Sequence, residues 1–306
     1  MLKNKELRTR ITTAAIYAAV MITFIVPGLW VPFLTVILYS VVTLMIGFEK
    51  AKAVNLRLGN ISLWPVAVAS VVVGLFGLFG ILGGTFLRGL PSAIDVSVNS
   101  VVAPRIIGYF ALFTLLLLPL VTLVRMWRRG ADLYPTTIAE IMIVISSAFP
   151  LVSTIALLYG VKCGWHWFVL AVLTTWVSDT AAYFAGKLFG RIKFSPVLSP
   201  NKTWEGTIGG IAGTMILYLI YIPLVIGNRI GFPSGISLAF AVIAALLMST
   251  ASTLGDVKSS ALKRWCGIKD FGSLLPGHGG VTDRFDSMST ALPAMLLMSM
   301  LAQLFV

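Results

Sequence analysis

The chain has 306 residues, of which 58% are hydrophobic and only 11% are charged, whereas about a quarter of the residues of a typical soluble domain are charged. This composition predicts a membrane protein and excludes a disordered chain, a disulfide-rich secreted scaffold and a collagen-like fibre. The net charge of +12 is explained by basic loops beside anionic lipid headgroups, with an anionic substrate as a further reason, and no nucleic acid is expected.

Apolar runs of about 20 residues, long enough to cross a bilayer as a helix, occur nine times. We therefore predict an all-α, polytopic bundle of about nine transmembrane helices. The runs lie near residues 11–26, 28–47, 61–84, 106–124, 136–159, 165–185, 207–226, 233–254 and 287–306. The first two are separated by little more than Pro27, so this segment forms either a tight hairpin or one re-entrant element. The first run is interpreted as a retained anchor, because no cleavage pattern follows it.

The distribution of basic residues predicts the orientation of these helices. With the N-terminus in the cytoplasm, 19 of the 23 Lys and Arg residues fall in cytoplasmic segments and 4 in outer segments, as the positive-inside rule requires. The chain is then expected to have an N-terminal region of about five helices, residues 1–160, and a C-terminal catalytic region, residues 161–306. The outer loop 85–105 has no clustered ionisable groups, so no chemistry is expected there.

Cys163 and Cys266 are too few and too far apart for a thiolate metal site. The predicted topology puts them on opposite faces of the membrane, which excludes a disulfide between them.

The sixth apolar run contains Asp179, whose charge would cost roughly 2.5 to 3.5 kcal/mol inside a bilayer. Tyr183 lies four residues later, on the same helical face, and small residues nearby permit close helix packing. A buried hydrogen bond to a Lys or Ser of another helix is the structural alternative. We favour a functional role in substrate binding, because intramembrane carboxylates are usually functional.

The loop 186–206 contains hydroxyl, amide and ammonium donors beside a proline turn and a predicted helix start: Ser199, Asn201, Lys202 and Thr203. Such donors suit a polyanion such as a triphosphate. The spacing is not that of a Walker A loop. An ordinary basic turn is the alternative interpretation.

The loop 256–286, rich in Gly, Lys and Asp, gives the strongest signal of a functional site. A helical interpretation of its start puts Asp256, Ser260 and Lys263 or Arg264 on one face. Asp283 and Asp286 are three residues apart, so both are expected to face the same way at the start of the last helix, near the positive end of its dipole.

Three carboxylates, Asp256, Asp283 and Asp286, form a hard oxygen-ligand set that suits Mg²⁺ better than zinc. The phosphates would be held by the basic residues of the same loop, Lys258, Lys263, Arg264, Lys269 and Arg284. Glycines 277, 279 and 280 around His278 are typical of backbone that approaches a ligand closely. The alternative is a solvated loop whose acidic and basic residues merely pair with each other.

The run from Ser260 to Asp286, S-x-x-K-R-x-x-x-x-K-D-x-G-x-x-x-P-x-H-G-G-x-x-D-R-x-D, resembles the signature of the CDP-diacylglycerol synthase family, also called phosphatidate cytidylyltransferase. Residues 199–210 and 178–186 resemble further blocks of that family, so the resemblance covers roughly the C-terminal 130 residues. It implies transfer of CMP from CTP to phosphatidic acid, giving CDP-diacylglycerol and pyrophosphate at the cytoplasmic face of a membrane.

The resemblance also implies Mg²⁺, with a monovalent cation such as K⁺ as a further candidate, and a polar cavity formed by the last spans. Asp256 and Asp283 would hold the metal with Asp286 as a third acid, and Lys263, Arg264 and His278 would lie around the phosphates. The length is typical of a bacterial inner-membrane protein, and a homodimer is left open.

Two other classes compete with this interpretation. A secondary transporter also has many spans and an intramembrane acid, but its acidic groups would cluster near the bilayer midplane rather than at cytoplasmic ends. A CTP-using lipid kinase, or a nucleotidyltransferase acting on another lipid phosphate, would share the metal chemistry and differ only in its substrate. A CDP-alcohol phosphotransferase is disfavoured, because its D-x-x-D-G-x-x-A-R pattern is absent.

Overall fold

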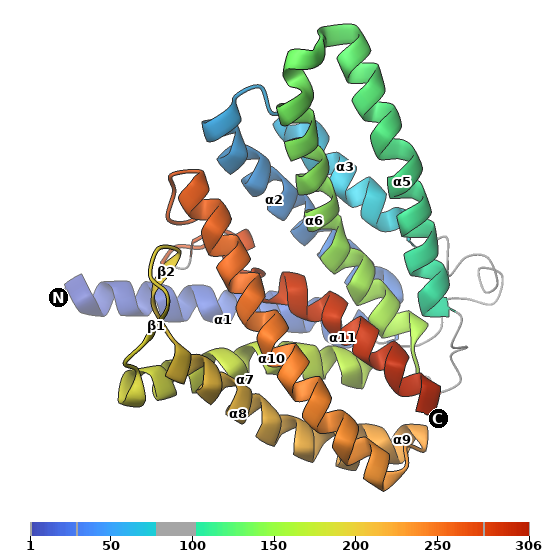
Figure 1. Cartoon of the computed structure of the whole chain (residues 1–306), viewed down its shortest axis with the longest axis vertical. Coiled ribbons are helices and arrows are strands. Elements are labelled where there is room, and N and C mark those ends of the chain that lie inside the picture. Colours follow the sequence, from blue (N-terminus) through green and yellow to red (C-terminus); the bar gives the residue numbers. More distant parts are fainter. Residues whose placement is uncertain (1, 29, 78–101, 278, 306) are drawn as a thin grey trace. The chain divides into compact units, whose positions relative to one another are not determined.

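The computed structural model describes residues 2–28, 30–77, 102–277 and 279–305, most of which are helical (Figure 1). Residue contacts divide the chain into two compact units. Unit 1 contains Met1–Ser92, Arg105–Val152 and Lys263–Phe285, and unit 2 contains Ala93–Pro104, Ser153–Leu262 and Asp286–Val306. Each unit is described by itself.

Unit 1 contains the N-terminal helices and the segment Lys263–Phe285. Its elements are α1 (Leu2–Gly28), α2 (Pro32–Leu58), α3 (Leu63–Phe76), most of α5 (Val102–Arg129), the 3-10 helix η2 (Ala131–Leu133), most of α6 (Tyr134–Gly160) and the 3-10 helix η4 (Thr282–Arg284). Helix α2 packs beside α3, and stacking of Phe110 on Phe149, with ring centroids 5.7 Å apart, joins α5 to α6.

The first two apolar runs form two separate helices rather than one element. Helix α1 ends at Gly28, and the Pro27 carbonyl accepts hydrogen bonds from the backbone N–H groups of Trp30 and Val31. Helix α2 then begins at Pro32. Proline is favoured in a first helical turn because its missing N–H would have no helical partner there.

Unit 2 contains the helices on either side of the predicted loop 186–206. Its elements are the end of α6, α7 (Gly164–Phe189), β1 (Lys193–Ser195), β2 (Ser199–Thr203), α8 (Trp204–Tyr221), the π-helix η3 (Ile222–Gly227), α9 (Asn228–Ile230), most of α10 (Ser234–Trp265), α11 (Met288–Ala302) and the 3-10 helix η5 (Gln303–Phe305).

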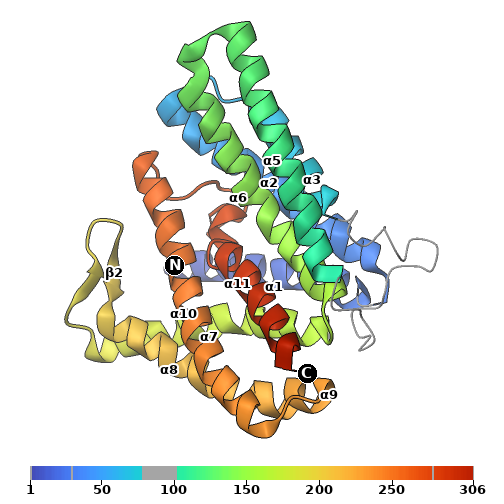
Figure 2. The ribbon, with the colours of Figure 1, turned by 45° about the vertical axis from the view of Figure 1, so that its right-hand side comes forward.

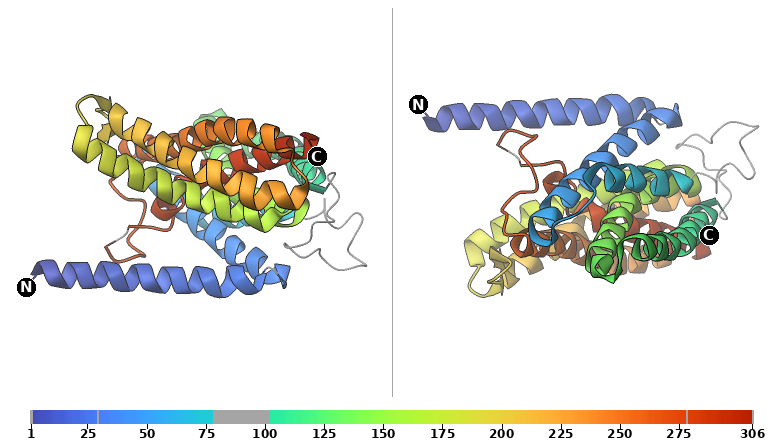
Figure 3. Two further views of the ribbon diagram at one scale, coloured as in Figure 1. Left: turned by 90° about the horizontal axis from the view of Figure 1, so that it is seen from below. Right: turned by 90° about the horizontal axis from the view of Figure 1, so that it is seen from above.

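Helices α7 and α8 lie side by side, with α10 next to them (Figure 3, left). Glycines permit this approach. A Cβ added to Gly206 would lie 2.8 Å from the carbonyl oxygen of Ala182, and one added to Gly213 would lie 2.7 Å from the Cβ of Ala181. The prediction that small residues on α7 allow close helix packing is confirmed.

The loop between α7 and α8 forms an antiparallel β-hairpin (Figure 2), which the all-α prediction did not include. The residues before Pro196 and Pro200 are driven to extended backbone, because the proline ring disfavours the helical conformation there. Thr203 then caps α8 by accepting a hydrogen bond from the backbone N–H of Gly206 at 3.1 Å. The predicted helix start after this loop is therefore confirmed.

Helix α10 is longer than the eighth apolar run, because it continues through Asp256 to Trp265. The helical interpretation of residues 256–264 is confirmed, and the predicted loop 256–286 therefore begins about ten residues too early. The buried Ser178 and Ser249 hydroxyls, 3.0 Å apart, join α7 to α10. Ser178, which makes this contact, directly precedes Asp179 in the chain.

Among the described residues, six helices are long and apolar enough to cross a membrane: Leu34–Leu58, Tyr134–Gly160, Gly164–Phe189, Trp204–Ile230, Ser234–Trp265 and Met288–Phe305. Two shorter apolar helices are Ala19–Gly28 and Leu63–Phe76. The chain is thus a helical membrane protein. Most of the predicted outer loop 85–105 lies outside the described residues. Cys163 and Cys266 are both buried, free thiols.

Candidate active site

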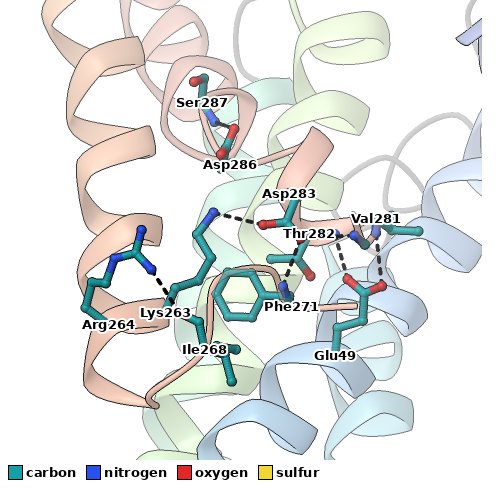
Figure 4. Close-up of polar contacts among 11 residues, drawn as sticks. Glu49, Lys263, Arg264, Ile268, Phe271, Val281, Thr282, Asp283, Asp286 and Ser287 are labelled. Carbon is teal, nitrogen blue, oxygen red and sulfur yellow. Dashed lines mark hydrogen bonds and ion pairs between the residues drawn. The ribbon is translucent and has the colours of Figure 1, made fainter. Parts of the chain in front are cut away.

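Asp283 binds several groups of one loop in unit 1. The Asp283 loop, residues 271–284 apart from residue 278, follows α10 and ends with η4. The side chain of Asp283 is buried, and both of its oxygens accept hydrogen bonds (Figure 4). Oδ1 accepts from Lys263 Nζ at 2.9 Å, and Oδ2 accepts from the backbone N–H groups of Phe271 at 2.9 Å and Gly280 at 3.0 Å. These bonds offset the desolvation of the buried charge.

Glu49, on α2, supplies a second buried carboxylate to the same loop. Its Oε1 accepts from the backbone N–H of Val281 at 3.0 Å, and its Oε2 accepts from that of Thr282 at 2.7 Å (Figure 4). Three successive N–H groups, those of Gly280, Val281 and Thr282, therefore donate to carboxylates. Asp283 thus holds the start of the loop, at Phe271, and Glu49 holds the backbone near its end.

Sequence reasoning missed Glu49. The residue follows an apolar run and precedes Lys50, which suggests an ordinary charged helix end. Lys50 instead donates to the carbonyl oxygen and the hydroxyl of Ser146, at 3.3 and 3.1 Å. The one available signal was an acid in the last turns of a membrane helix, where charge is costly.

The glycines of the Asp283 loop allow its backbone to lie against carboxylates of the protein itself. A Cβ on Gly280 would lie 2.5 Å from Glu49 Oε1, and one on Gly272 would lie 2.6 Å from the same atom. Gly277 and Gly279 have φ of 76° and 82°, which favours glycine. In the described structure the backbone thus closes around the protein's own carboxylates. His278, expected at the phosphates, lies outside the described residues.

The sequence suggested that Asp283 and Asp286 both lie at the start of the last helix, but the structure separates them. Asp283 belongs to the short 3-10 helix η4, whereas Asp286 lies in the turn before α11, where its Oδ1 accepts the N–H of Ser287 at 2.7 Å. The backbone leaves the helical conformation at Phe285, with φ of −107° and ψ of 8°, so η4 ends before Asp286.

In unit 2, α10 packs tightly against the start of α11. A Cβ on Gly255 would lie 2.7 Å from the backbone oxygen of Asp286, so this contact requires glycine. One turn further along, Lys258 donates to the Ser289 hydroxyl at 3.1 Å. Asp256 follows Gly255, and its Oδ2 pairs with Lys202 Nζ at 2.6 Å. Both members of this pair keep about a quarter of their side-chain surface exposed, 24% and 27%.

Lys202 also lines a cavity of about 510 Å³ in unit 2, which we call the α7–α8 pocket. This volume lies within the range of ligand-binding cavities. The pocket brings together the residues predicted from two separate sequence blocks, which are Asp179 and Tyr183 on α7 and Ser199, Asn201, Lys202 and Thr203 on the hairpin. Thr253, which sequence reasoning did not select, adds a hydroxyl from α10.

The remaining predicted residues are spread along α10 and the Asp283 loop. Ser260 is buried on α10, and Arg264 donates to the carbonyl oxygen of Ile268 at 3.3 Å. Lys269 and Arg284 are exposed.

The described side chains form no group of three or more His, Cys, Asp and Glu that would hold a metal ion by themselves. The carboxylate oxygens of the predicted acids nevertheless have the right chemistry for Mg²⁺, which commonly takes one or two carboxylates and completes its shell with water and substrate phosphates.

A family model described as the cytidylyltransferase family matches residues 8–302. Among similar proteins, those named phosphatidate cytidylyltransferase from Staphylococcus saprophyticus and Staphylococcus haemolyticus are each 43% identical over 130 residues, covering 42% of this chain and 47% of each relative. The protein of that name from Haemophilus influenzae is 41% identical over 125 residues, covering 40% of this chain and 41% of the relative. The chain thus matches just under half the length of these relatives. Because the family model matches nearly the whole sequence, this chain belongs to the cytidylyltransferase family.

Proposed function

We propose that this protein is a phosphatidate cytidylyltransferase, which transfers CMP from CTP to phosphatidic acid and releases pyrophosphate. The observation that carries the proposal is the α7–α8 pocket, where Lys202 and the donors of the hairpin face one cavity in a membrane protein. The names of the similar proteins support the same reaction.

The chemistry of this reaction explains why such a site needs cations. A phosphate oxygen of phosphatidic acid attacks the α-phosphorus of CTP, a new P–O bond forms, and the bond to the β-phosphate breaks. The attacking phosphate is already largely anionic near neutral pH because its second pKa is close to 6, so no strong general base is needed. The barrier comes from bringing two anions together, which positive groups lower.

The residues of the pocket suit the nucleotide. Lys202, Ser199 and Asn201 would donate to phosphate oxygens. Asp179 would repel a phosphate, so we assign it to the N–H or O–H donors of the nucleoside, with the Tyr183 ring beside it. Lys263, Arg264, His278 and Asp286 are proposed to act at the reacting phosphates, and Thr203, Lys258, Ser260, Lys269 and Arg284 to support substrate binding.

We propose Asp256, Asp283 and Asp286 as oxygen ligands of Mg²⁺, with K⁺ as a candidate second cation. A bound Mg²⁺ would neutralise phosphate charge during the transfer. The residues of the chain would contribute orientation, because Lys263 and two backbone N–H groups hold the Asp283 carboxylate in one direction.

We further propose about nine membrane helices with the N-terminus in the cytoplasm, in a bacterial inner membrane. The 19 to 4 distribution of basic residues between the two sides supports this orientation. Residues 161–306 would then form the catalytic region, with CTP reaching it from the cytoplasm and phosphatidic acid from the bilayer.

The direct test is product formation by the purified protein in lipid and detergent, given CTP and phosphatidic acid with Mg²⁺ or with a chelator. We expect CDP-diacylglycerol and pyrophosphate in equal amounts, and loss of both when the chelator is present. If folded protein forms no product, the same assay with other lipid phosphates tests the competing nucleotidyltransferase activity. Uptake of a solute into vesicles that contain the protein, with no product formed, would instead indicate transport.

A further inference from the structure

Glu49 is a buried acid to which the proposed reaction gives no role, and it makes two of the bonds that hold the Asp283 loop. Its side chain is 8% exposed. It comes from α2, 232 residues before Val281 in the sequence, so the contact exists only in the folded chain. Each of its oxygens accepts one backbone N–H of the loop, at 3.0 and 2.7 Å.

We propose that Glu49 is a positioning residue for cytidylyl transfer, because it holds the N–H groups of Val281 and Thr282 and thereby sets the direction of Asp283. This inference rests on the proposed function. Asp283 directly follows these two donors in the chain, so a change in their position moves its Cα. The same shift would disturb the 2.9 Å bond between Asp283 and Lys263.

The glycines of the loop support this role. The three nearest atoms to a Cβ built on Gly280 all belong to the Glu49 carboxylate, at 2.5, 2.6 and 2.7 Å. A Cβ on Gly272 would also meet this carboxylate first. The loop therefore lacks side chains where its backbone must reach Glu49. Hydrogen bonds from backbone N–H groups to an ionised carboxylate are stronger than those between neutral groups, and both oxygens of Glu49 accept such bonds.

The first experiment compares Glu49→Gln with Glu140→Gln. Glu140 is a matched control, since it is also buried in unit 1 and also accepts a backbone N–H, that of Ser62 at 2.8 Å. Amide hydrogen exchange reports on the loop directly, and steady-state kinetics report on the reaction. We expect Glu49→Gln to speed exchange at residues 279–284 and to lower kcat about 10- to 100-fold, the scale of a displacement of about 1 Å. The KM for CTP should change little, and Glu140→Gln should change neither readout.

A second experiment uses Gly280→Ala, which places a methyl group against the Glu49 carboxylate. Glu49→Asp shortens the acid by one methylene and withdraws it from that methyl group. We expect the double variant Gly280→Ala with Glu49→Asp to turn over faster than Gly280→Ala alone. Because a Cβ on Gly280 would touch the Glu49 carboxylate, the two losses should not simply add. Strictly additive losses would show that Glu49 does not hold the backbone at Gly280.

Three results would overturn the proposal. These are unchanged exchange at residues 279–284 in Glu49→Gln, faster exchange with a wild-type kcat, and strictly additive losses in the double variant. Wild-type protein that forms no CDP-diacylglycerol would instead refute the proposed function. The exchange measurement needs no substrate, so it would still decide whether Glu49 holds the loop.

Discussion

The Asp283 loop and the α7–α8 pocket use charged residues in opposite ways. In the Asp283 loop, the buried carboxylates of Asp283 and Glu49 accept five hydrogen bonds from the protein. In the pocket, Lys202 lines the cavity, and it pairs with Asp256. The two side chains of this pair are 24% and 27% exposed.

This difference teaches what each region can contribute to function. Polar groups that several hydrogen bonds hold inside the protein stay in one arrangement, which suits the positioning of a reactive group. A partly exposed ion pair contributes little to stability. Its members can therefore exchange partners at a low cost in free energy when a ligand binds. We therefore expect substitutions in the loop to lower stability and turnover together, and substitutions in the pocket to change substrate binding.

The largest effect is expected for Asp283→Ala. The substitution leaves Lys263 and the N–H groups of Phe271 and Gly280 without their acceptor, and breaking a buried ion pair costs about 3–5 kcal/mol. Thermal unfolding should report this loss, and CDP-diacylglycerol formation should disappear. Asp132→Ala is the control, because Asp132 is exposed in the same unit, and it should change stability by less than about 0.5 kcal/mol. Normal turnover of Asp283→Ala would refute the importance of the loop.

Lys202→Ala should separate binding from stability. Loss of the exposed pair with Asp256 should cost at most about 1 kcal/mol of unfolding free energy. Loss of a charged hydrogen bond to a phosphate should raise the KM for CTP about 10- to 100-fold, since such bonds contribute about 1.5–3 kcal/mol. Lys193→Ala, an exposed lysine on β1, is the control. An unchanged KM would place the nucleotide elsewhere.

Gly213→Ala tests the packing that supports the pocket. The added Cβ would lie 2.7 Å from the Cβ of Ala181, so α7 and α8 must move apart, at a cost of about 1–3 kcal/mol in unfolding free energy. Gly235→Ala on α10 adds the same methyl group where no other atom lies within 4 Å, and it should be neutral or slightly stabilising. Equal melting temperatures for the two variants would contradict the close α7–α8 contact.

The smallest effect concerns Cys266, which lies shortly before the Asp283 loop. Burial raises the pKa of its thiol, and the positive charge of Arg57 acts in the opposite direction. Arg57→Gln should raise this pKa further, reduce the thiolate fraction at pH 8 and slow alkylation, because the thiolate is the reactive form. Iodoacetamide labelling of a Cys163→Ser protein, in which Cys266 is the remaining thiol, measures the rate. Faster labelling would contradict the role given to Arg57.

The candidate site could be predicted from the sequence where local spacing decides the geometry. Helical periodicity placed Asp179 and Tyr183 on one face, and both line the α7–α8 pocket. The run 256–264 was identified as helical, and it forms the end of α10. Local rules failed for Asp283 and Asp286, because the backbone leaves the helical conformation between them, at Phe285. The N–H groups just before Asp283 are held by Glu49, a distant residue that no local pattern connects to them.

By itself, the sequence determined the membrane class of the chain, its helical content and the residue types of a polyanion site, because apolar run length and charge pattern are local properties. Tertiary structure alone decided that the glycines of the Asp283 loop close around Glu49 and that Lys202 pairs with Asp256. Both contacts join residues far apart in the chain, 232 positions in the case of Glu49 and Val281. No local pattern encodes them, since which buried acid meets which N–H group depends on how the helices pack.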